Sequence, residues 1–253
     1  MKLLIDAGNS RIKSAFWDGS QLRHGQMLAH ATSADTPMAS ASEFAALWKD
    51  IPALDEIWIA SVAAATLEHE LTNSLAARFA VTPRFARSPA NACGVRNAYT
   101  APARLGIDRF LGLVAVHAQF PGAAVIAGCG TALTLDAIDT HGNHFGGLIA
   151  PAPGLMRSAL LDRTARLGDL AAASIVDFAD TTSAAVESGT WLAAVALVER
   201  FVTRTRMRVG MEPTMIVCGG GGKRLGALLE VPHRLETDLV LRGLALFADA
   251  THV

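Results

Sequence analysis

Cysteine residues and net charge are both scarce in this sequence, and each shortage excludes a class of protein. The 253 residues include three cysteines, Cys93, Cys129 and Cys218, an odd number spaced far apart. They predict neither a disulfide framework nor a paired-thiol zinc site, and they are typical of a reducing cytosol. The formal net charge is -1 and the pI is about 6.7. Without a basic field, neither nucleic acid nor an anionic membrane is an expected partner.

Long hydrophobic runs are also missing. No stretch approaches the ~18 uninterrupted apolar residues of a membrane span, and the apolar run from Leu3 to Ile5 meets Asp6 too early for a signal peptide. We therefore expect a cytoplasmic protein that does not enter a membrane. Hydrophobic residues nevertheless make up 51% of the chain, which is enough for the cores of two modest domains.

Hydrophobic periodicity and turn residues predict an α/β chain. The expected strands cover residues 2–5, 12–17, 22–28, 56–62, 123–127, 132–139, 144–149 and 214–218. The expected helices cover residues 41–48, 67–79, 111–120, 153–161, 183–206, 225–229 and 239–249. Residues 83–102 contain three prolines and no periodic pattern of hydrophobic residues. We therefore expect a long irregular loop, which often has a function in a compact chain.

The turn between the first two expected strands has the composition of a phosphate-binding site. In Asp6-x-Gly8-Asn9-Ser10-x-x-Lys13, Gly8 lets backbone amides approach phosphate oxygens and Lys13 supplies positive charge. Asn9 and Ser10 can donate hydrogen bonds, and Asp6 can hold a magnesium ion, usually through water. An ordinary Asp/Asn/Gly hairpin turn is the alternative interpretation.

The same strand, turn, strand unit recurs half a chain later. The second turn reads Gly128-x-Gly130-Thr131-Ala132-x-Thr134-x-Asp136. It aligns with the first turn when Gly8 is laid on Gly130 and Ser10 on Ala132. Such an internal repeat predicts a duplicated fold. Two phosphate-type turns are expected to hold one nucleotide triphosphate from both sides.

Residues 219–222 are four consecutive glycines that follow an expected strand. Bare backbone at this point can lie beside a planar or anionic ligand. The run is not a Walker A loop, because Val217 stands where the first glycine is needed and Arg224 replaces the Ser or Thr after the lysine.

The residues Gly106-Ile107-Asp108-Arg109 follow the irregular loop and precede a helix. A carboxylate there can act as a base toward a substrate hydroxyl, and a guanidinium can bind a substrate carboxylate. In the alternative interpretation Asp108 caps the helix and Arg109 is exposed.

Three further side chains invite a functional interpretation that the sequence does not favour. His141 and His144 flank a Gly-Asn turn without a visible third ligand, so we expect exposed turn residues rather than a metal site. Cys129 lies within the second turn without an identifiable base, so we expect a small packing residue.

Four motifs together resemble type III pantothenate kinases, also called the Bvg accessory factor family. In chain order they are Asp6-x-Gly8-Asn9-Ser10, Tyr99-x-x-Pro102-x-x-Leu105-Gly106-x-Asp108-Arg109, Gly130-Thr131-Ala132-x-Thr134-x-Asp136 and Gly146-Gly147-x-Ile149-x-Pro151-x-x-Gly154. The resemblance implies an α/β fold of duplicated ribonuclease-H-like domains, of the actin/Hsp70/sugar-kinase superfamily, in residues 1–115 and 116–253. It also implies a homodimer that transfers the γ-phosphate of ATP to pantothenate, the first step of coenzyme A biosynthesis.

The resemblance also implies roles for individual residues. Asp108 would be the catalytic base, and Thr182 would reach the substrate across the dimer. The implied substrate-binding residues are Tyr99, Gly106, Ile107, Asp108, Arg109 and Thr182. The implied nucleotide-binding residues are Asp6, Ala7, Gly8, Asn9, Ser10, Arg11, Ile12, Lys13, Gly130 and Thr131, with Asp6 on Mg²⁺.

Two positions depart from the family pattern. The family often has an Asp, associated with a monovalent cation, where this chain has Gly128, and Thr181 stands where Asn is common. Loss of the carboxylate removes both an oxygen ligand and a charge. The sequence therefore predicts weak or absent activation by K⁺ or NH₄⁺.

Two other functions are compatible with the fold. One is an ATP-binding regulatory protein without kinase turnover, since fold does not settle function. The other is a sugar or acetate kinase, for which the chain is short. The motif Gly106-x-Asp108-Arg109 beside Tyr99 favours the pantothenate kinase, because a nucleotide switch needs no substrate pocket.

Overall fold

The structure is a computed structural model that describes residues 1–29, 41–49, 51, 53–163 and 173–251. The chain forms two compact units, one from Met1–Gln119 together with Asp238–Val253 and the other from Phe120–Thr237. Each unit contains a five-stranded sheet. The expected domain boundary between residues 115 and 116 would assign the C-terminal helix to the second domain. In the structure this helix packs within the first unit.

The first sheet begins with an antiparallel meander and continues with parallel strands. β1 (Lys2–Ala7) pairs antiparallel with β2 (Arg11–Trp17), which pairs antiparallel with β3 (Leu22–Ala29). On its other side, β1 pairs parallel with β4 (Glu56–Ser61), which pairs parallel with β5 (Arg84–Phe85). The strand order is therefore β3-β2-β1-β4-β5.

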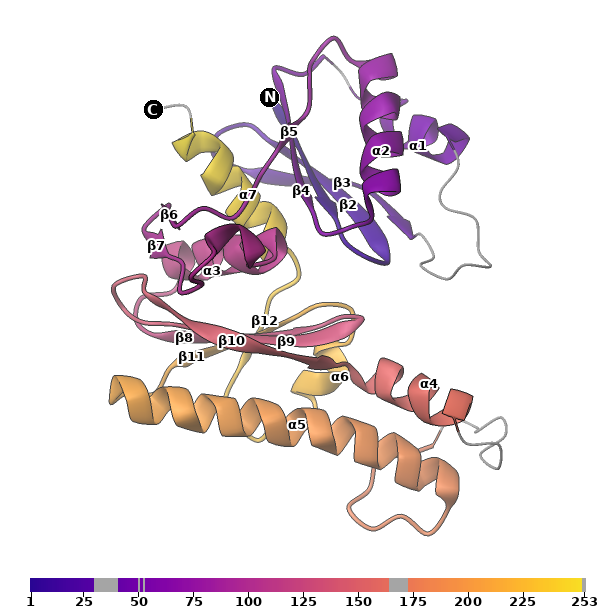
Figure 1. Cartoon of the computed structure of the whole chain (residues 1–253), viewed down its shortest axis with the longest axis vertical. Coiled ribbons are helices and arrows are strands. Elements are labelled where there is room, and N and C mark those ends of the chain that lie inside the picture. Colours follow the sequence, from indigo (N-terminus) through magenta and orange to yellow (C-terminus); the bar gives the residue numbers. More distant parts are fainter. Residues whose placement is uncertain (30–40, 50, 52, 164–172, 252–253) are drawn as a thin grey trace. The chain divides into compact units, whose positions relative to one another are not determined.

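Helices cover both faces of this sheet (Figure 1). α1 (Ala41–Trp48) and α2 (Ala65–Arg78) share one hydrophobic core with β1, and this core includes Leu3, Trp48 and Leu71. α3 (Ile107–Gln119) and α7 (Leu239–Ala250) pack against each other and against β4 on the opposite face. There Trp58 of β4 meets the ring of Phe247 edge to face, with 6.1 Å between the centroids.

The loop between β5 and α3 is less irregular than expected. It contains a small hairpin of β6 (Asn91–Ala92) and β7 (Val95–Arg96), followed by one turn of 3₁₀ helix, η1 (Pro102–Arg104). α3 itself begins four residues earlier than predicted, so that Asp108 lies in its first turn.

The second unit repeats this plan. β8 (Ala124–Cys129), β9 (Ala132–Ile138) and β10 (His144–Pro151) form the antiparallel part of its sheet. β11 (Thr214–Cys218) and β12 (Arg234–Leu235) add in parallel beyond β8. The order β10-β9-β8-β11-β12 matches the first sheet strand for strand. The predicted duplicated α/β fold is therefore confirmed.

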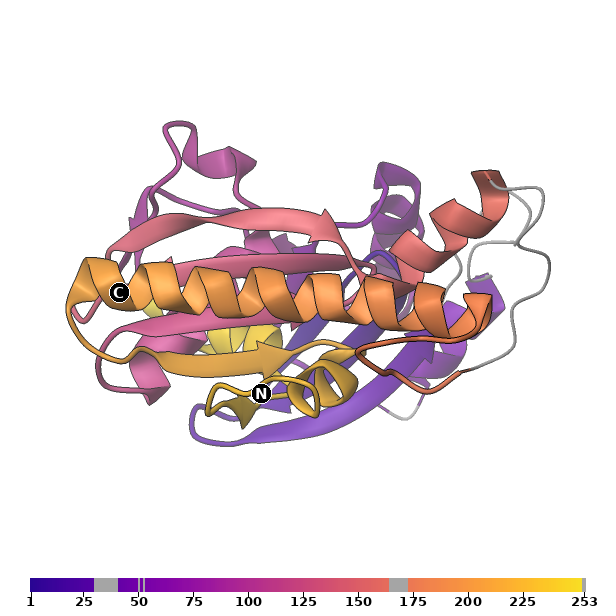
Figure 2. The same cartoon turned by 90° about the horizontal axis from the view of Figure 1, so that it is seen from below.

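One long helix covers the second sheet. α5 (Thr182–Val209) lies along the sheet (Figure 2) and buries Trp191, Val195 and Val198 in a core shared with β8, β9 and β11. Its start is fixed by Thr181, whose Oγ1 accepts a hydrogen bond from the Ala184 amide at 3.3 Å. Gly210 ends it with φ +72°, as a left-handed cap requires.

Two short helices complete the second unit. α4 (Pro153–Arg163) follows β10, and α6 (Gly222–Gly226) follows β11, three residues earlier than the predicted helix 225–229. Among the described residues, no helix combines the length and the apolar composition that crossing a membrane requires.

Candidate active site

The first turn is a tight hairpin with exposed polar residues. The Gly8 amide donates to the Arg11 carbonyl at 3.0 Å, and Asn9, Ser10 and Arg11 are exposed. The two residues that flank this turn are buried. Ala7 and Ile12 lie opposite each other and are each 1% exposed, so their side chains belong to the core and a ligand would meet only their backbone.

A carboxylate and an ammonium face each other at the base of this turn. Asp6 and Lys13 are directly paired across β1 and β2. The pKa of Asp6 is raised to about 7: burial is the largest cause, the negative charge of Asp108 adds to it, and Lys13 opposes it. The two carboxylates thus lie close enough to repel each other, although they are far apart in the sequence.

The carboxyl ends of β1 and β4 bring these groups together. The Val62 amide donates to the Ala7 carbonyl at 3.1 Å, which places the segment after β4 beside the first turn. Gly106 lies against this segment, because a Cβ added to it would be 3.8 Å from Val62 Cγ1. The same Cβ would be only 2.6 Å from Asp108 Oδ1. A side chain at position 106 would therefore displace the carboxylate.

We expect Gly106→Ala to lower turnover by about tenfold or more while leaving the unfolding temperature unchanged. The added methyl group meets the end of a flexible side chain, so the carboxylate rotates away and the fold is spared, and misplacing a reacting group by about 1 Å costs up to 10²-fold in rate. Steady-state kinetics and thermal unfolding measure both effects.

Gly189→Ala on α5 is the matched control, because it also adds a methyl group at a glycine but has no neighbouring atom within 4 Å. Full activity of Gly106→Ala would show that the position of the Asp108 carboxylate is unimportant.

Arg109 and Tyr99 form a pair beside Asp108. Arg109 Nη1 donates to the Tyr99 hydroxyl at 3.0 Å, and the guanidinium lies 5.8 Å from the centre of the ring. Arg109 is 8% exposed. The alternative interpretation, in which Arg109 is an exposed residue after a helix cap, is therefore wrong. The sequence-predicted substrate residues Tyr99, Gly106, Asp108 and Arg109 all lie in the first unit, around the start of α3.

Asn97 organises this loop and was not predicted. Its Nδ2 donates to the carbonyls of Pro89 and Pro102, at 3.2 and 3.1 Å, and its Oδ1 accepts from the Tyr99 amide at 3.0 Å. It is 9% exposed. Asn97 thus ties the backbone at Pro89 and Pro102 to the amide of Tyr99. Its position two residues before Tyr99 was the one available signal, since Asn side chains often bond to the backbone two residues on.

The second turn is one residue shorter than the first. The Gly130 amide donates to the Ala132 carbonyl at 2.9 Å, whereas the Gly8 amide reaches Arg11. Ala132 therefore corresponds to Arg11, and the alignment of Ser10 on Ala132 is wrong. Gly130 and Thr131 are exposed at the tip, where amide and hydroxyl donors can meet phosphate.

The space at Gly128 is filled by a side chain of the neighbouring strand. A Cβ at Gly128 would lie 2.8 Å from Thr134 Oγ1 and 3.6 Å from Cys218 Sγ. Gly128 is paired with both residues in the sheet. The position that matches Asp6 thus holds a hydroxyl group nearby but no carboxylate of its own.

The glycines after β11 have a packing role. The Gly221 amide donates to the Cys129 carbonyl at 2.9 Å, and a Cβ at Gly221 would be 2.7 Å from Cys129 Sγ. Gly219 has φ +88°, and a Cβ there would overlap the Cys129 carbonyl. Cys129 is 2% exposed and burial raises the pKa of its thiol, which agrees with the predicted packing role.

His144 was predicted as an exposed turn residue, and this is wrong. His144 is 4% exposed and its Nε2 lies 2.9 Å from Asp136 Oδ1, which is also buried. His141 is exposed in the turn, as predicted. Thr182 is the first residue of α5 and is exposed, in the second unit.

Solved structures share the fold at low sequence identity. A Baf family protein from Campylobacter jejuni superposes with a TM-score of 0.62 at 19% identity, covering 99% of this chain and 100% of the other. The activator of the 2-hydroxyisocaproyl-CoA dehydratase from Clostridium difficile, with bound ADPNP, gives 0.50 at 9% identity, covering 99% and 96%. These similarities concern the fold alone.

Sequence comparison identifies the family. The model of type III pantothenate kinases matches residues 2–204. The type III pantothenate kinase of Xanthomonas campestris pv. campestris strain B100 is 40% identical over 97% of this chain and 96% of its own length. That of Nitrosococcus oceani is 36% identical over 99% and 95%. The chain belongs to the type III pantothenate kinase family.

Proposed function

We propose that this protein transfers the γ-phosphate of ATP to pantothenate and gives 4'-phosphopantothenate, the first step of coenzyme A biosynthesis. One observation carries the proposal beyond the family assignment. The Asp108 carboxylate, in the first turn of α3, lies close to Asp6 of the phosphate-type turn and next to the buried Arg109. A base, a metal ligand and a cation for the substrate therefore occur in one region of the first unit.

Each residue has a role that follows from its chemistry. Asp108 accepts the proton of the pantothenate hydroxyl as that oxygen attacks the γ-phosphorus, and ADP leaves. Arg109, held by the Tyr99 hydroxyl, binds a polar or anionic group of the substrate together with Tyr99. Gly106 leaves room for the Asp108 carboxylate. In the first turn Asn9, Ser10 and the half-buried Lys13 bind phosphate oxygens, and in the second turn the exposed Gly130 and Thr131 do so.

The environment of Asp6 fits a magnesium ion. Burial and the charge of Asp108 make ionised Asp6 costly, and a divalent cation offsets both effects. In the ranges of the chain that the structure describes, no group of three or more His, Cys, Asp or Glu side chains could hold a metal ion. Magnesium bound through one carboxylate, water and the nucleotide phosphates is compatible with this, and it neutralises charge on those phosphates.

The test of this function is a coupled ADP-release assay with purified protein and Mg–ATP. Pantothenate is compared with glucose, glycerol, acetate and no acceptor. We expect a rate with pantothenate at least about tenfold above every other condition, because a site built for both a hydroxyl and a carboxylate group rejects acceptors that lack one of the two. Equal ADP release with and without pantothenate would indicate an ATPase or a nucleotide-binding protein instead.

Activation by monovalent cations should be weak. At the position where a cation-associated carboxylate is common, this chain has Gly128, and the space that a Cβ would take there lies 2.8 Å from Thr134 Oγ1. A hydroxyl group carries no charge to offset desolvation of K⁺. We expect less than about threefold change in initial rate when K⁺ replaces Na⁺ at matched ionic strength. A tenfold rise would show that a cation site exists without this Asp; Gly128→Asp, combined with Thr134→Ala to make room, then tests whether a carboxylate strengthens it.

A homodimer is the proposed assembly, and the exposed apolar residues support it. The apolar face of α5 packs on its own sheet, so it does not form the interface. Exposed apolar side chains lie instead on β10, on α4 and in the segment before α5: Ile149 is 64% exposed, Leu155 46%, Leu160 43% and Phe178 96%. A surface of this kind marks an interface with a second chain.

Phe178→Asp is expected to halve the mass found by light scattering at micromolar concentration and to reduce activity, because Thr182 would no longer reach the partner's substrate. A charged residue buried in an apolar interface costs several kcal/mol, about enough to dissociate a micromolar dimer. A wild-type protein that is monomeric and fully active would contradict both the dimer and the role of Thr182. Met207→Asp is the matched control, because Met207 is an apolar residue of α5 that is 68% exposed. Phe145→Asp cannot serve as a control, because Phe145 packs on the core.

A further inference from the structure

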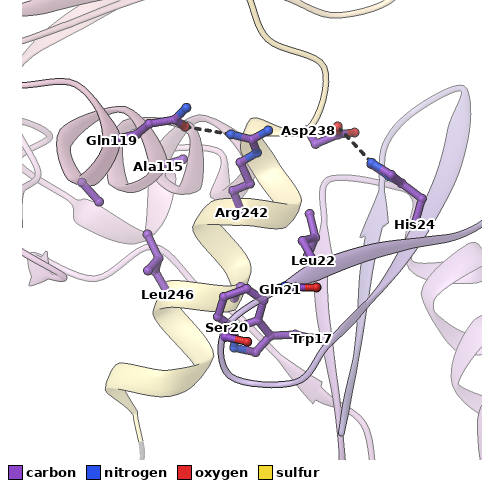
Figure 3. A pocket seen from close by; sticks show the side chains of 12 residues that line it. Trp17, Ser20, Gln21, Leu22, His24, Ala115, Gln119, Asp238, Arg242 and Leu246 are labelled. Carbon is purple, nitrogen blue, oxygen red and sulfur yellow. Dashed lines mark hydrogen bonds and ion pairs between the residues drawn. The ribbon is translucent and has the colours of Figure 1, made fainter.

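A cavity of about 490 Å³ lies in the first unit (Figure 3). In the β1–β2 register Trp17, at the cavity, pairs with Lys2, whereas Lys13 pairs with Asp6. Four residues of strand, about 13 Å, separate Trp17 from Lys13. Along α3, Gln119 of the cavity and Asp108 are at opposite ends, about 16 Å apart. None of the sequence-predicted site residues lines this cavity.

Four elements of one unit form the wall. The end of β2 and the start of β3 provide Trp17 and Leu22, the last turn of α3 provides Ala118, and α7 provides Leu246. The Trp17 ring has a fixed orientation, because its Nε1 donates to Asp249 Oδ2 at 2.9 Å and Asp249 also accepts from Lys2 Nζ at 2.8 Å. The cavity therefore presents an oriented aromatic ring and aliphatic groups to a ligand.

Charged groups lie at the rim of the same cavity. Arg242 Nη1 donates to Gln119 Oε1 at 3.0 Å, and His24 Nε2 lies 3.6 Å from Asp238 Oδ2 (Figure 3). Arg242 is exposed, so a ligand in the cavity can reach its guanidinium. A planar guanidinium suits a carboxylate or a phosphate, which it binds through two parallel hydrogen bonds.

We propose that this cavity is a second ligand site of the protein, and that it takes a small amphiphilic anion: an apolar or aromatic body against Trp17 and Leu246, and one carboxylate or phosphate on Arg242. An anion is favoured over a cation because the carboxylate at the rim, Asp238, already has His24 as its partner, and its side chain is 14% exposed against 66% for His24. The site belongs to the first unit alone and is independent of the kinase reaction.

Three matched probes test the proposal on the full chain: 2-naphthoate, its neutral analogue 2-naphthalenemethanol, and its cationic analogue 2-naphthylmethylammonium. Isothermal titration and the shift of the unfolding temperature report binding. We expect 2-naphthoate to bind about tenfold more tightly than either analogue, which is the discrimination that one charge-assisted hydrogen-bonded pair provides. Saturating Mg–ATP should not displace it.

Two variants place the binding in this cavity. Arg242→Gln should remove the preference for the anion and leave the three probes within about threefold of one another. Ala118→Trp, at an exposed lining residue, should fill the cavity and abolish binding of all three. Arg204→Gln, an exposed arginine on α5, is the control and should bind like the wild type.

The proposal is overturned if the three probes bind the wild type equally, if Arg242→Gln keeps the preference, or if Mg–ATP competes with 2-naphthoate. Since all measurements are of binding, they stand whether or not the protein phosphorylates pantothenate. Unfolding temperatures of the free variants show that each has folded, and Arg242→Gln and Ala118→Trp test the same cavity independently.

Discussion

Asp108→Asn is expected to lower turnover by about 10²-fold or more while Mg–ATP binding survives. Asparagine has nearly the same shape, so it keeps the start of α3 intact, but it cannot accept the proton of the attacking hydroxyl. The loss should appear in kcat and in kcat/KM together, because the proton is transferred only in the transition state. Steady-state kinetics and titration of the nucleotide measure the two effects separately.

Asp162→Asn on α4 is the control for Asp108→Asn, since it removes one exposed carboxylate of the second unit. It should leave turnover within about twofold, as is usual for surface substitutions. If Asp108→Asn also remained within about threefold of the wild type, Asp108 would not be the base. A loss of nucleotide binding in this variant would point to a structural role instead.

Asp6→Asn should nearly abolish turnover and yet stabilise the metal-free protein at pH 8. The pKa of Asp6 in the folded protein is about 7, against the ordinary value of 3.8, so folding opposes ionisation of this group. Below pH 3.8 the carboxyl group is protonated in the folded and the unfolded protein, so it costs no folding free energy. This cost grows as the pH rises from 3.8 to about 7. Above pH 7 the cost is complete and amounts to about 4 kcal/mol at most. Asparagine removes it.

The measurement is chemical or thermal unfolding of both proteins between pH 5 and pH 8 without magnesium. The advantage of Asp6→Asn should be largest at pH 8 and shrink toward pH 5. Added Mg²⁺ should stabilise the wild type more than the variant, because the ion offsets the charge that the variant lacks. A variant that is less stable than the wild type at pH 8 would contradict the inferred environment of Asp6. Asp18→Asn is the contrasting variant, since turn hydrogen bonds from Gln21 and Ser20 lower the pKa of exposed Asp18 to about 2.

Local residue patterns predicted most of the elements. Alternating apolar residues in short runs bounded by turns predicted all the strands that form the meanders, and the two glycine-containing turns predicted the repeat. The strands β5 and β12 were missed because each has two residues. A segment of two residues is too short to show an alternation of apolar and polar side chains. They become strands only by pairing with β4 and β11.

The sequence by itself determined the duplicated α/β plan, the two turns and the motif around Asp108, because these depend on residues that are neighbours along the chain. Only the tertiary structure decided which groups meet. It brought Asp108 close to Asp6, buried Arg109 and His144, packed the glycines 219 and 221 on Cys129, and returned α7 to the first sheet. The reason is physical: the energy of each of these placements comes from desolvation and packing against segments distant in the sequence, and no local pattern records which segments those are.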